Sequence, residues 1–201
     1  ILVLLYYYLL KYKGWHGAAV RNLATTHLLD AIAERFGEKC YEVPVGFKHI
    51  SGKMLETGAV IGGESSGGLT VRGHIQGKDG IYAAALLVEM LAVTGKSVSQ
   101  LYREITVKYG TLYYADGSFT MTNARKEALQ EQLFVRMELP DFGVPAERVN
   151  REDGCKLYFA DGSWTICRFS GTEPLLRVAA EGNTQSQAEE YLRTWKRALE
   201  L

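Results

Sequence analysis

Apolar residues recur along the first half of the chain with the spacing of short strands alternating with helices. Residues 1–12 are predicted to form a helix, although a run of tyrosines makes a strand the alternative. Residues 27–36 are predicted to form a second helix, because leucine, isoleucine and phenylalanine recur there at helical spacing. Further elements continue the alternation. Helices are expected over 53–57, from 79 or 80 to about 93, and from a cap at 97 or 99 to about 109, and strands over 18–21, 40–43 and 59–61. Residues 1–109 are therefore expected to form an α/β domain with helices around a mixed sheet.

The helix over 79–93 is expected to turn one apolar face inward, made of Ile81, Ala84, Ala85, Val88, Leu91 and Ala92. A turn that exposes a lysine is expected at Pro44 to Lys48, between the strand over 40–43 and the helix over 53–57.

The pattern changes after residue 109. Asp161-Gly162 between two apolar stretches is a strong hairpin signal, because this dipeptide suits a type I′ turn. A similar sequence at residues 112–120 predicts another hairpin. Residues 140–150 are expected to form a loop. A mostly polar helix over 124–137, a strand over 175–180 and a last helix over 184–199 complete the pattern. Residues 110–201 are therefore expected to form a smaller α+β domain.

Composition narrows the function classes. The 201 residues are 47% hydrophobic and 23% charged with zero formal net charge, so no overall basic field favours nucleic acid. The apolar stretch at residues 1–10 is too short to span a bilayer and lacks the basic region of a signal peptide. The three cysteines show no metal-binding spacing, which favours free thiols in a reducing cytoplasm. The chain begins without methionine, so it is expected to be part of a longer protein.

A glycine-rich stretch between residues 62 and 68 places Glu64, Ser65 and Ser66 among four glycines. Glycine lets a ligand approach the main chain, so these glycines are expected to serve a ligand rather than packing. A carboxylate and two hydroxyls suit a ligand rich in hydroxyl groups, which points to a sugar. Neither a P-loop ending nor the dinucleotide-binding glycine spacing is present. A plain turn is the alternative.

A second stretch has the composition of a phosphate site. Arg168, Ser170, Gly171 and Thr172 come in close succession, and Arg177 follows on the next predicted strand. Arginine offers a fork of donors that matches phosphate oxygens, hydroxyls add donors, and glycine turns backbone N–H groups toward an anion. The two arginines flank the loop, so both are expected to reach one phosphate. The alternative is a turn with two solvated arginines.

Four stretches in this order resemble motifs of the α-D-phosphohexomutases, the superfamily that includes phosphoglucomutase and phosphomannomutase. They are Pro-Val-Gly-Phe-Lys at 44–48, Gly-Glu-Ser-Ser-Gly-Gly at 63–68, Gly-Lys-Asp-Gly-Ile at 77–81 and Arg-Phe-Ser-Gly-Thr-Glu-Pro at 168–174. The resemblance covers essentially the whole chain and corresponds to the third and fourth domains of that superfamily. It implies a third domain over 1–109 with the sugar-binding loop and a C-terminal domain over 110–201 with the phosphate-binding loop.

The resemblance implies an enzyme that interconverts hexose 1-phosphate and hexose 6-phosphate through a bisphosphate intermediate. It assigns sugar binding to Glu64, Ser66, Gly46 and Phe47, and a catalytic role near the reacting phosphate to Lys78. It also implies that the second stretch binds the phosphate group that is not transferred. The residues expected to hold this phosphate are Arg168, Ser170, Gly171, Thr172 and Arg177.

Two positions depart from the superfamily pattern. Ser65 stands where many bacterial relatives carry glutamate, and Gly68 stands where some phosphomannomutases have a histidine proposed for proton transfer. The choice among glucose, mannose and glucosamine phosphates is left open, as is the oligomeric state.

The chain contains neither a Ser-His-Asn-Pro stretch nor an Asp-x-Asp-x-Asp-Arg stretch. The resemblance places the phosphoserine and the Mg²⁺ loop in two N-terminal domains. Mg²⁺ is therefore expected for the full-length enzyme, and no metal is expected on this chain. The chain alone is expected to be inactive. The expected partners are a hexose phosphate or bisphosphate and those N-terminal domains, without nucleic acid or membrane. A non-catalytic phosphosugar-binding or regulatory module is the alternative, and a nucleotide-binding domain ranks last.

Overall fold

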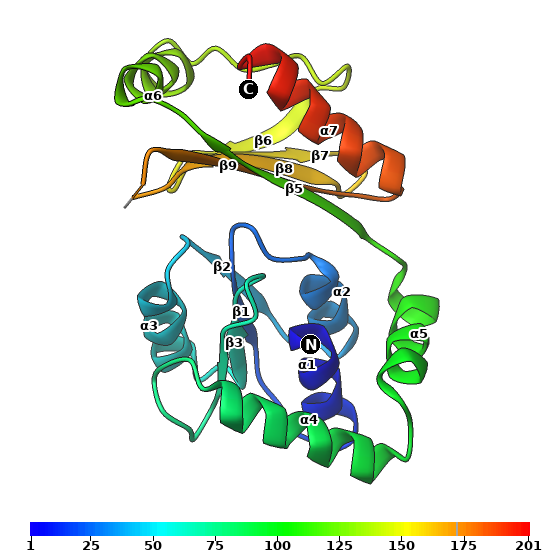
Figure 1. Cartoon of the computed structure of the whole chain (residues 1–201). Coiled ribbons are helices and arrows are strands. Elements are labelled where there is room, and N and C mark those ends of the chain that lie inside the picture. Colours follow the sequence, from blue (N-terminus) through cyan, green and yellow to red (C-terminus); the bar gives the residue numbers. More distant parts are fainter. Residues whose placement is uncertain (172) are drawn as a thin grey trace. The chain divides into compact units, whose positions relative to one another are not determined.

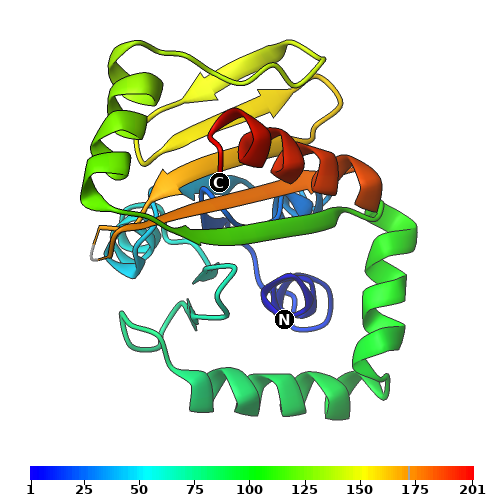
Figure 2. The same ribbon diagram turned by 45° about the horizontal axis from the view of Figure 1, so that its top comes forward.

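The computed structural model describes residues 1–171 and 173–201, drawn in Figures 1 and 2. The chain divides into two compact units, Ile1–Thr111 and Leu112–Leu201. Each unit has its own sheet and its own helices.

The first unit is built on a sheet with the strand order β2-β1-β3-β4. Its strands are β1 (Ala19–Asn22), β2 (Cys40–Val43), β3 (Ile61–Gly63) and β4 (Leu69–Val71). Strand β1 pairs in parallel with both β2 and β3, whereas β4 returns antiparallel to β3. The expected mixed sheet is confirmed, and the carboxyl ends of β1, β2 and β3 share one edge of it.

Helices cover both faces of this sheet. They are α1 (Leu2–Lys11), α2 (Leu28–Arg35), α3 (Phe47–Thr57), α4 (Gly80–Thr94) and α5 (Val98–Tyr109). Figure 1 shows α3 on one side of the sheet and α1 and α2 on the other, while α4 and α5 both pack against α1. The predicted turn over 44–48 is partly wrong, because α3 begins at Phe47 and already includes Lys48, which is exposed.

Two glycines of the motif stretch lie in strand β3 and serve packing, contrary to the sequence expectation. A Cβ on Gly62 would lie 2.5 Å from Ile50 and Met54 of α3, and one on Gly63 would lie 2.8 Å from Leu2 of α1. Such distances are closer than carbon atoms approach one another, so a side chain at either position would push a helix away from the sheet. These two glycines let helices on opposite faces approach β3 closely.

The predicted inner face of α4 is wrong. Leu86 and Met90 are the buried side chains, whereas Ile81 is 86% exposed and Val88 is 65% exposed. Nearly every residue of α4 is apolar, so the helix has no polar face from which its orientation could be inferred.

A charged cluster joins α1 to α5. Glu104 of α5 accepts hydrogen bonds from Lys11, Lys96 and Tyr7 and is 18% exposed at its side chain. The bonds from Lys11, then Lys96 and Tyr7, lower the pKa of Glu104 to about 2. A carboxyl whose pKa is lowered by folding stabilises the folded state above its usual pKa, and this contribution is lost as the pH falls toward the lowered value.

Glu104→Gln is expected to lower the free energy of unfolding by about 1 kcal/mol near neutral pH. The difference from wild type should shrink as the pH falls from about 4.5 toward about 2, because the wild-type carboxyl then takes up a proton on unfolding. Urea denaturation along this pH range measures it. Glu56→Gln, which removes an exposed partner of Lys53, is the control, and an equal cost of Glu104→Gln at every pH would contradict the assignment.

The second unit is a purely antiparallel sheet with the order β5-β9-β8-β7-β6, which confirms the expected α+β arrangement. Its elements are β5 (Tyr113–Thr120), α6 (Asn123–Gln130), a π-helical turn (Glu131–Val135), β6 (Ala146–Asn150), β7 (Cys155–Phe159), β8 (Trp164–Phe169), β9 (Leu175–Gly182) and α7 (Gln185–Ala198). The hairpin around Asp161-Gly162 is confirmed, with Tyr158 opposite Trp164 and Gly162 at φ +83°.

Two other expectations for this unit are wrong. Residues 113–120 form one strand that pairs with β9 over its whole length, so Asp116-Gly117 lies inside a strand rather than in a turn. The predicted loop over 140–150 contains strand β6, which pairs with β7 through a register shift. In both places pairing with a distant strand overrides the local turn signal.

The core of the second unit lies between its sheet and the helical segments α6, the π-helical turn and α7. Trp195 is fully buried, and its indole N–H donates to Thr165 Oγ1 at 2.9 Å. The other members are Leu129, Leu133, Cys155, Leu157, Phe159, Cys167, Leu176, Val178, Ala180, Tyr191 and Leu199. Cys155 and Cys167 are free thiols, and burial raises the pKa of Cys155 to about 11, so this thiol is protonated and unreactive near neutral pH.

Candidate functional site

Glu64 is the centre of the candidate sugar site in the first unit. It follows β3 and is only 5% exposed. Its Oε1 accepts from the side-chain amide of Asn22 at 3.2 Å and from the backbone N–H of Gly46 at 3.3 Å. Its Oε2 lies 2.6 Å from the ammonium of Lys78. The carboxylate is therefore held in one orientation by three segments that are far apart in sequence.

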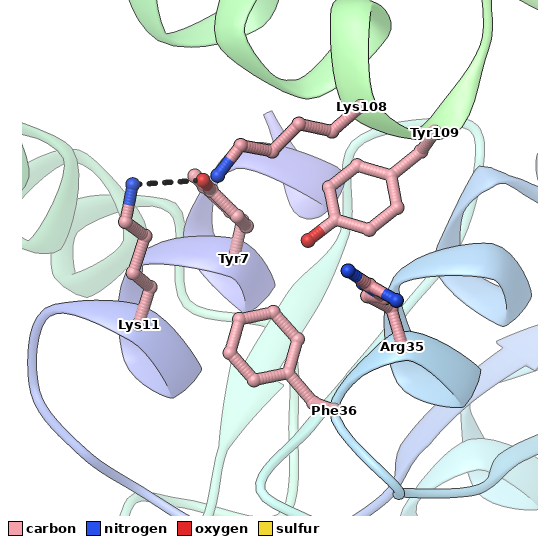
Figure 3. Close-up of a pocket in the computed structure, with 6 residues that line it drawn as sticks. All are labelled: Tyr7, Lys11, Arg35, Phe36, Lys108 and Tyr109. Atoms are coloured by element: carbon pink, nitrogen blue, oxygen red, sulfur yellow. Dashed lines mark hydrogen bonds between the residues drawn. The ribbon is translucent and has the colours of Figure 1, made fainter.

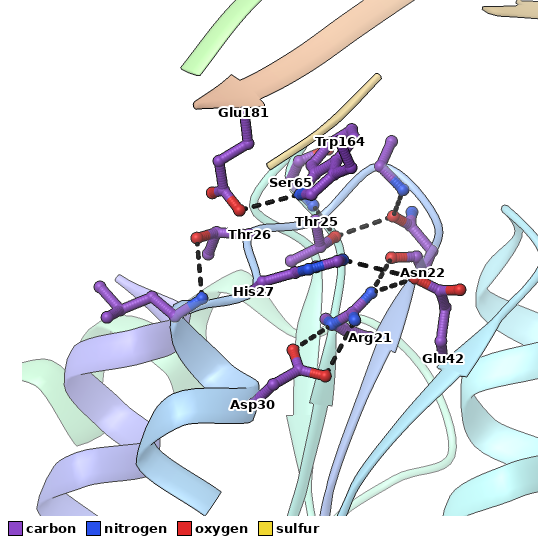
Figure 4. A network of polar contacts seen from close by, with 12 residues as sticks. Arg21, Asn22, Thr25, Thr26, His27, Asp30, Glu42, Ser65, Trp164 and Glu181 are labelled. Atoms are coloured by element: carbon purple, nitrogen blue, oxygen red, sulfur yellow. Dashed lines mark hydrogen bonds and ion pairs between the residues drawn. The ribbon is translucent and has the colours of Figure 1, made fainter. Parts of the chain in front are cut away.

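The end of β1 and the residues that follow it hold the turn between β3 and β4 in place. Asn22 Oδ1 accepts from the hydroxyl of Thr25 at 2.8 Å and from the N–H of Ala24 at 3.0 Å. The N–H of Ser65 in turn donates to Thr25 Oγ1 at 2.9 Å (Figure 4). Asn22 thus touches both the carboxylate of Glu64 and the threonine that anchors its neighbour, so it links β1 to the turn.

A buried ion network lies immediately before Asn22. The guanidinium of Arg21 is 4% exposed and contacts Asp30 of α2 and Glu42 of β2, each at 2.6 Å (Figure 4). Both carboxylates compensate this one buried cation, and the hydrogen bonds that the guanidinium donates to them tie α2 and β2 to the end of β1. The network holds the edge of the sheet on which Glu64 and Asn22 sit.

Lys78 reaches Glu64 across Gly68. A Cβ on Gly68 would lie 2.4 Å from Cδ of Lys78 and 2.8 Å from its Cε. The lysine stem therefore fills the space that a side chain at position 68 would occupy. The ammonium lies 5.5 Å from the centre of the Phe47 ring, and the side chain is 49% exposed. One of its donors faces Glu64, and an ammonium has two more to offer a ligand.

The residue after Lys78 fixes the local backbone. Asp79 caps α4 by accepting from the N–H of Tyr82 at 2.9 Å, and its second oxygen lies 2.9 Å from His74 Nε2. The ring of His74 stacks on that of Tyr82, with centres 3.9 Å apart. The bond from the Tyr82 N–H, then that from His74, lowers the pKa of Asp79. This closed set of contacts anchors the backbone from which Lys78 extends.

The remaining predicted sugar-binding residues lie in the same place. Gly46 has φ +129°, which a residue with a side chain rarely adopts, and it directs its N–H to Glu64. Ser66 is exposed at the tip of the turn between β3 and β4, which is closed by hydrogen bonds between Glu64 and the backbone of Gly67 and Gly68. Gly46, Phe47, Glu64, Ser66 and Lys78 thus form one cluster on the carboxyl edge of the first sheet.

The predicted phosphate site is built on the β8–β9 hairpin of the second unit. Arg168 and Arg177 are directly opposite each other in this antiparallel pair, so their side chains leave the same face of the sheet. Like charges directly opposite destabilise a sheet unless an anion offsets them. Arg168 lies 3.8 Å from Asp153, whereas Arg177 is exposed and has no ion pair with a described residue. This pairing favours a bound anion.

The turn of that hairpin is held from α6. Ser170 is 7% exposed, and its N–H donates to the carbonyl of Leu175 at 2.7 Å. The ammonium of Lys126 donates to the carbonyl of Ser170 at 3.1 Å, so it adds a third positive charge beside the loop. Gly171 is exposed, and Thr172 lies outside the described residues.

Gly154 brings the preceding hairpin against Arg168. It has φ +95°, and a Cβ there would lie 2.5 Å from the carbonyl of Cys167 and 2.9 Å from Cβ of Arg168. Only glycine fits both this backbone conformation and this approach. The close contact places Asp153 beside the guanidinium of Arg168.

Asn22, Thr25, His74, Lys126 and Asp153 were not among the predicted site residues. An asparagine three residues before a threonine at a strand end is a turn signal, but nothing local links it to a carboxylate 42 positions away. His74 lies three residues before the motif at 77–81, but nothing in the sequence links it to Asp79 or Tyr82. No local pattern marks Lys126 or Asp153.

No metal centre emerges in the described part of the chain. Over residues 1–171 and 173–201, no group of at least three histidine, cysteine, aspartate or glutamate side chains is arranged to hold a metal ion. Over the same residues no single helix is long and apolar enough to cross a membrane, although α4 and α5 meet that test as a pair bent by 79°.

Each of the two units contains residues that match a known protein family. Residues 1–109 match the family described as "Phosphoglucomutase/phosphomannomutase, alpha/beta/alpha domain III". Residues 121–194 match "Phosphoglucomutase/phosphomannomutase, C-terminal domain".

Individual relatives give the same result. A phosphoglucomutase/phosphomannomutase of Thermococcus kodakarensis is 33% identical over 92% of this chain and 38% of its own length. A phosphoglucosamine mutase of Acetivibrio thermocellus is 32% identical over 86% of the chain and 33% of its own length. The crystal structure of a putative phosphomannomutase from Thermus thermophilus matches the whole chain and 40% of its own, with 30% identity and a TM-score of 0.76. The chain thus spans about two fifths or less of these relatives.

Proposed function

Because this chain belongs to the phosphoglucomutase/phosphomannomutase family, a family of phosphosugar mutases, we propose that it supplies sugar and phosphate recognition to an enzyme that interconverts hexose 1-phosphate and hexose 6-phosphate through a bisphosphate. Glu64 is the observation that carries the proposal. A nearly buried carboxylate, fixed by an amide, a backbone N–H and an ammonium, is oriented before any ligand arrives.

Glu64 and Ser66 are the proposed contacts to sugar hydroxyls. A carboxylate can accept about four hydrogen bonds, and Glu64 receives three from the protein, so one position is left for a hydroxyl. Ser66 is exposed at the tip of the same turn, where its hydroxyl can donate or accept. Phe47 and Gly46 bound the site from the start of α3.

Lys78 is the proposed catalytic residue. Its ammonium is paired with Glu64, and its unused donors can stabilise negative charge on a phosphate oxygen or give a proton to the sugar oxygen that the phosphoryl group leaves. When a sugar hydroxyl instead gains the phosphoryl group, the amine that has given up its proton can take the proton of that hydroxyl. Pairing with Glu64 keeps the charge at the sugar site in the absence of ligand. The anchored backbone at Asp79 limits how far the lysine moves when a phosphate competes for it.

Arg168, Ser170, Gly171, Thr172 and Arg177 are the proposed holders of the phosphate that stays in place. Two arginines on one face of the hairpin can form several charge-assisted hydrogen bonds with a dianion. Lys126 keeps the turn in position through the carbonyl of Ser170 and adds positive charge.

The phosphoryl group itself is proposed to come from a part of the enzyme outside this chain. The described residues offer no cluster of carboxylates for Mg²⁺, and the sequence lacks the superfamily's phosphoserine and metal stretches. Mg²⁺ and the N-terminal domains are therefore proposed partners of the complete enzyme, where the metal would neutralise phosphate charge. The chain alone is proposed to bind without turnover.

An NMR titration of the ¹⁵N-labelled chain tests the proposal. Glucose 1-phosphate, glucose 6-phosphate, glucose and inorganic phosphate are added separately up to about 10 mM, a range that detects dissociation constants near 1 mM. Both sugar phosphates should shift the amides of residues 64–68 and 168–177. Inorganic phosphate should shift only the second group.

The same titration with Glu64→Gln should lose the shifts at residues 64–68 and keep those at 168–177. Glu138→Gln, which removes an exposed carboxylate partner of Arg136, serves as the control. The proposal is wrong if neither sugar phosphate shifts either group, or if Glu64→Gln leaves both groups of shifts unchanged.

A further inference from the structure

A pocket of about 510 Å³ opens in the first unit at the ends of three helices. It is lined by Tyr7 and Lys11 of α1, Arg35 and Phe36 at the end of α2, and Lys108 and Tyr109 at the end of α5 (Figure 3). Its volume falls in the range of pockets that hold small organic molecules and is much larger than a phosphate ion needs.

This pocket is separate from the candidate sugar site. Helix α2 leads from the carboxyl end of β1 to the start of β2, and these two strands are parallel, so α2 ends at the edge of the sheet where the strands begin. The N–H of Ala19, the first residue of β1, donates to the carbonyl of Lys39 just after α2, which confirms this location. Glu64 follows the carboxyl end of β3, which is at the opposite edge.

The described residues that line the pocket include three cationic side chains and no carboxylate. Lys11 is paired with Glu104, which also pairs with Lys96. Arg35 and Lys108 are exposed, and neither forms a hydrogen bond or ion pair through its side chain with any described residue. Two cations from different helices therefore border the same space without a carboxylate between them.

Rings form the rest of the wall. Tyr7 is 1% exposed and packs edge-to-face against Phe36 and Tyr109, with ring centres 6.2 Å and 6.0 Å apart. Its hydroxyl donates to Glu104, which fixes the ring. The pocket thus combines a wall of packed aromatic rings with an exposed cationic rim, which suits a ligand with a flat apolar part and an anionic group.

A simpler role for these cations is to offset the helix dipoles, because each lies in the last turn of its helix. Offsetting the helix dipoles does not require that the cations border the same pocket or that aromatic rings line it. From the unpaired cations and the ring-lined cavity together, we propose that this pocket binds a small phosphate monoester that carries a planar ring. Arg35 and Lys108 hold the phosphate, and the ring lies against Phe36 and Tyr109.

An NMR titration of the 201-residue chain with adenosine 5′-monophosphate tests this proposal, with adenosine and inorganic phosphate in parallel. The amides of Phe36 and Tyr109 should shift and saturate with adenosine monophosphate at a dissociation constant of about 1 mM or tighter. Adenosine alone should bind at least about tenfold more weakly, since the charged contacts anchor the ligand.

The double variant Arg35→Gln/Lys108→Gln should weaken binding at least about tenfold. Arg103→Gln/Lys196→Gln makes the same change in net charge outside the pocket and should bind like wild type. Three results overturn the proposal: no shifts at about 10 mM adenosine monophosphate, equal affinity for adenosine, or equal losses in both double variants. Because Glu64 and Arg168 lie outside the pocket, these results are independent of the proposed mutase role.

Discussion

Arg168→Ala is expected to weaken phosphate binding by the second unit by about 2 to 3 kcal/mol, or roughly 30- to 150-fold. Arg168 is directly opposite Arg177 on the β8–β9 hairpin, and its guanidinium is the partly buried one, 20% exposed beside Asp153. The loss has two parts, the charged hydrogen bonds to the anion and the repulsion left between Asp153 and the incoming phosphate. Isothermal titration with glucose 1-phosphate measures it.

Stability separates this role from a structural one. Removing Arg168 also removes the repulsion between two like charges in register, so the free energy of unfolding should change by less than about 1 kcal/mol. Arg168→Lys keeps the charge without the two-pronged donor and should give intermediate affinity. Arg193→Ala, on the exposed face of α7, is the matched control. Unchanged affinity in Arg168→Ala would remove this hairpin from the proposed site.

Gly68→Ala is expected to break the contact between Lys78 and Glu64 while leaving the fold intact. The new Cβ would lie 2.4 Å from Cδ of Lys78, and a flexible side chain moves aside more easily than backbone. Lys78 should leave Glu64, and affinity for hexose phosphate at residues 64–68 should fall about tenfold, the value of one charge-assisted hydrogen bond. The ¹³C shift of the Glu64 carboxylate and a glucose 1-phosphate titration report both effects.

Gly77→Ala is the matched control for this change. Gly77 is next to Lys78, and a Cβ there would meet no atom within 4 Å. It should leave the Glu64 shift and the affinity unchanged. If Gly68→Ala behaves like Gly77→Ala, Lys78 does not depend on the space at position 68, and the absence of a side chain there has another reason.

The fold was predictable where the local pattern and the tertiary structure agree. Residues 27–36 show a clear helical period and form α2, and Asp161-Gly162 joins β7 to β8 as expected. Residues 113–120 contain the same Asp-Gly signal but form one strand, because pairing with β9 along all eight positions outweighs a local turn. Nearly every residue of helix α4 is apolar, so only its neighbours decide that Leu86 and Met90 turn inward.

The candidate site was predictable at the level of motifs and not of contacts. Three motifs identified Gly46, Phe47, Glu64 and Lys78. In the structure Gly46 and Lys78 contact the carboxylate of Glu64, and Lys78 lies near the ring of Phe47. The role of Asn22 could not be inferred, since its bond to Glu64 spans 42 residues and depends on the parallel pairing of β1 with β3. The register of Arg168 with Arg177 likewise follows from the hairpin as folded.

The most direct test of the central claim is mutase activity in a fusion protein. This chain replaces the matching 38% of the Thermococcus kodakarensis relative, and conversion of glucose 1-phosphate to glucose 6-phosphate is measured with Mg²⁺. The fusion is expected to turn over, and Arg168→Ala within it should raise KM, while Lys78→Gln should lower kcat. A fusion that is folded by circular dichroism and gel filtration, yet converts no more substrate than the relative without its C-terminal part, would contradict the claim that this chain provides the recognition half of a phosphohexomutase.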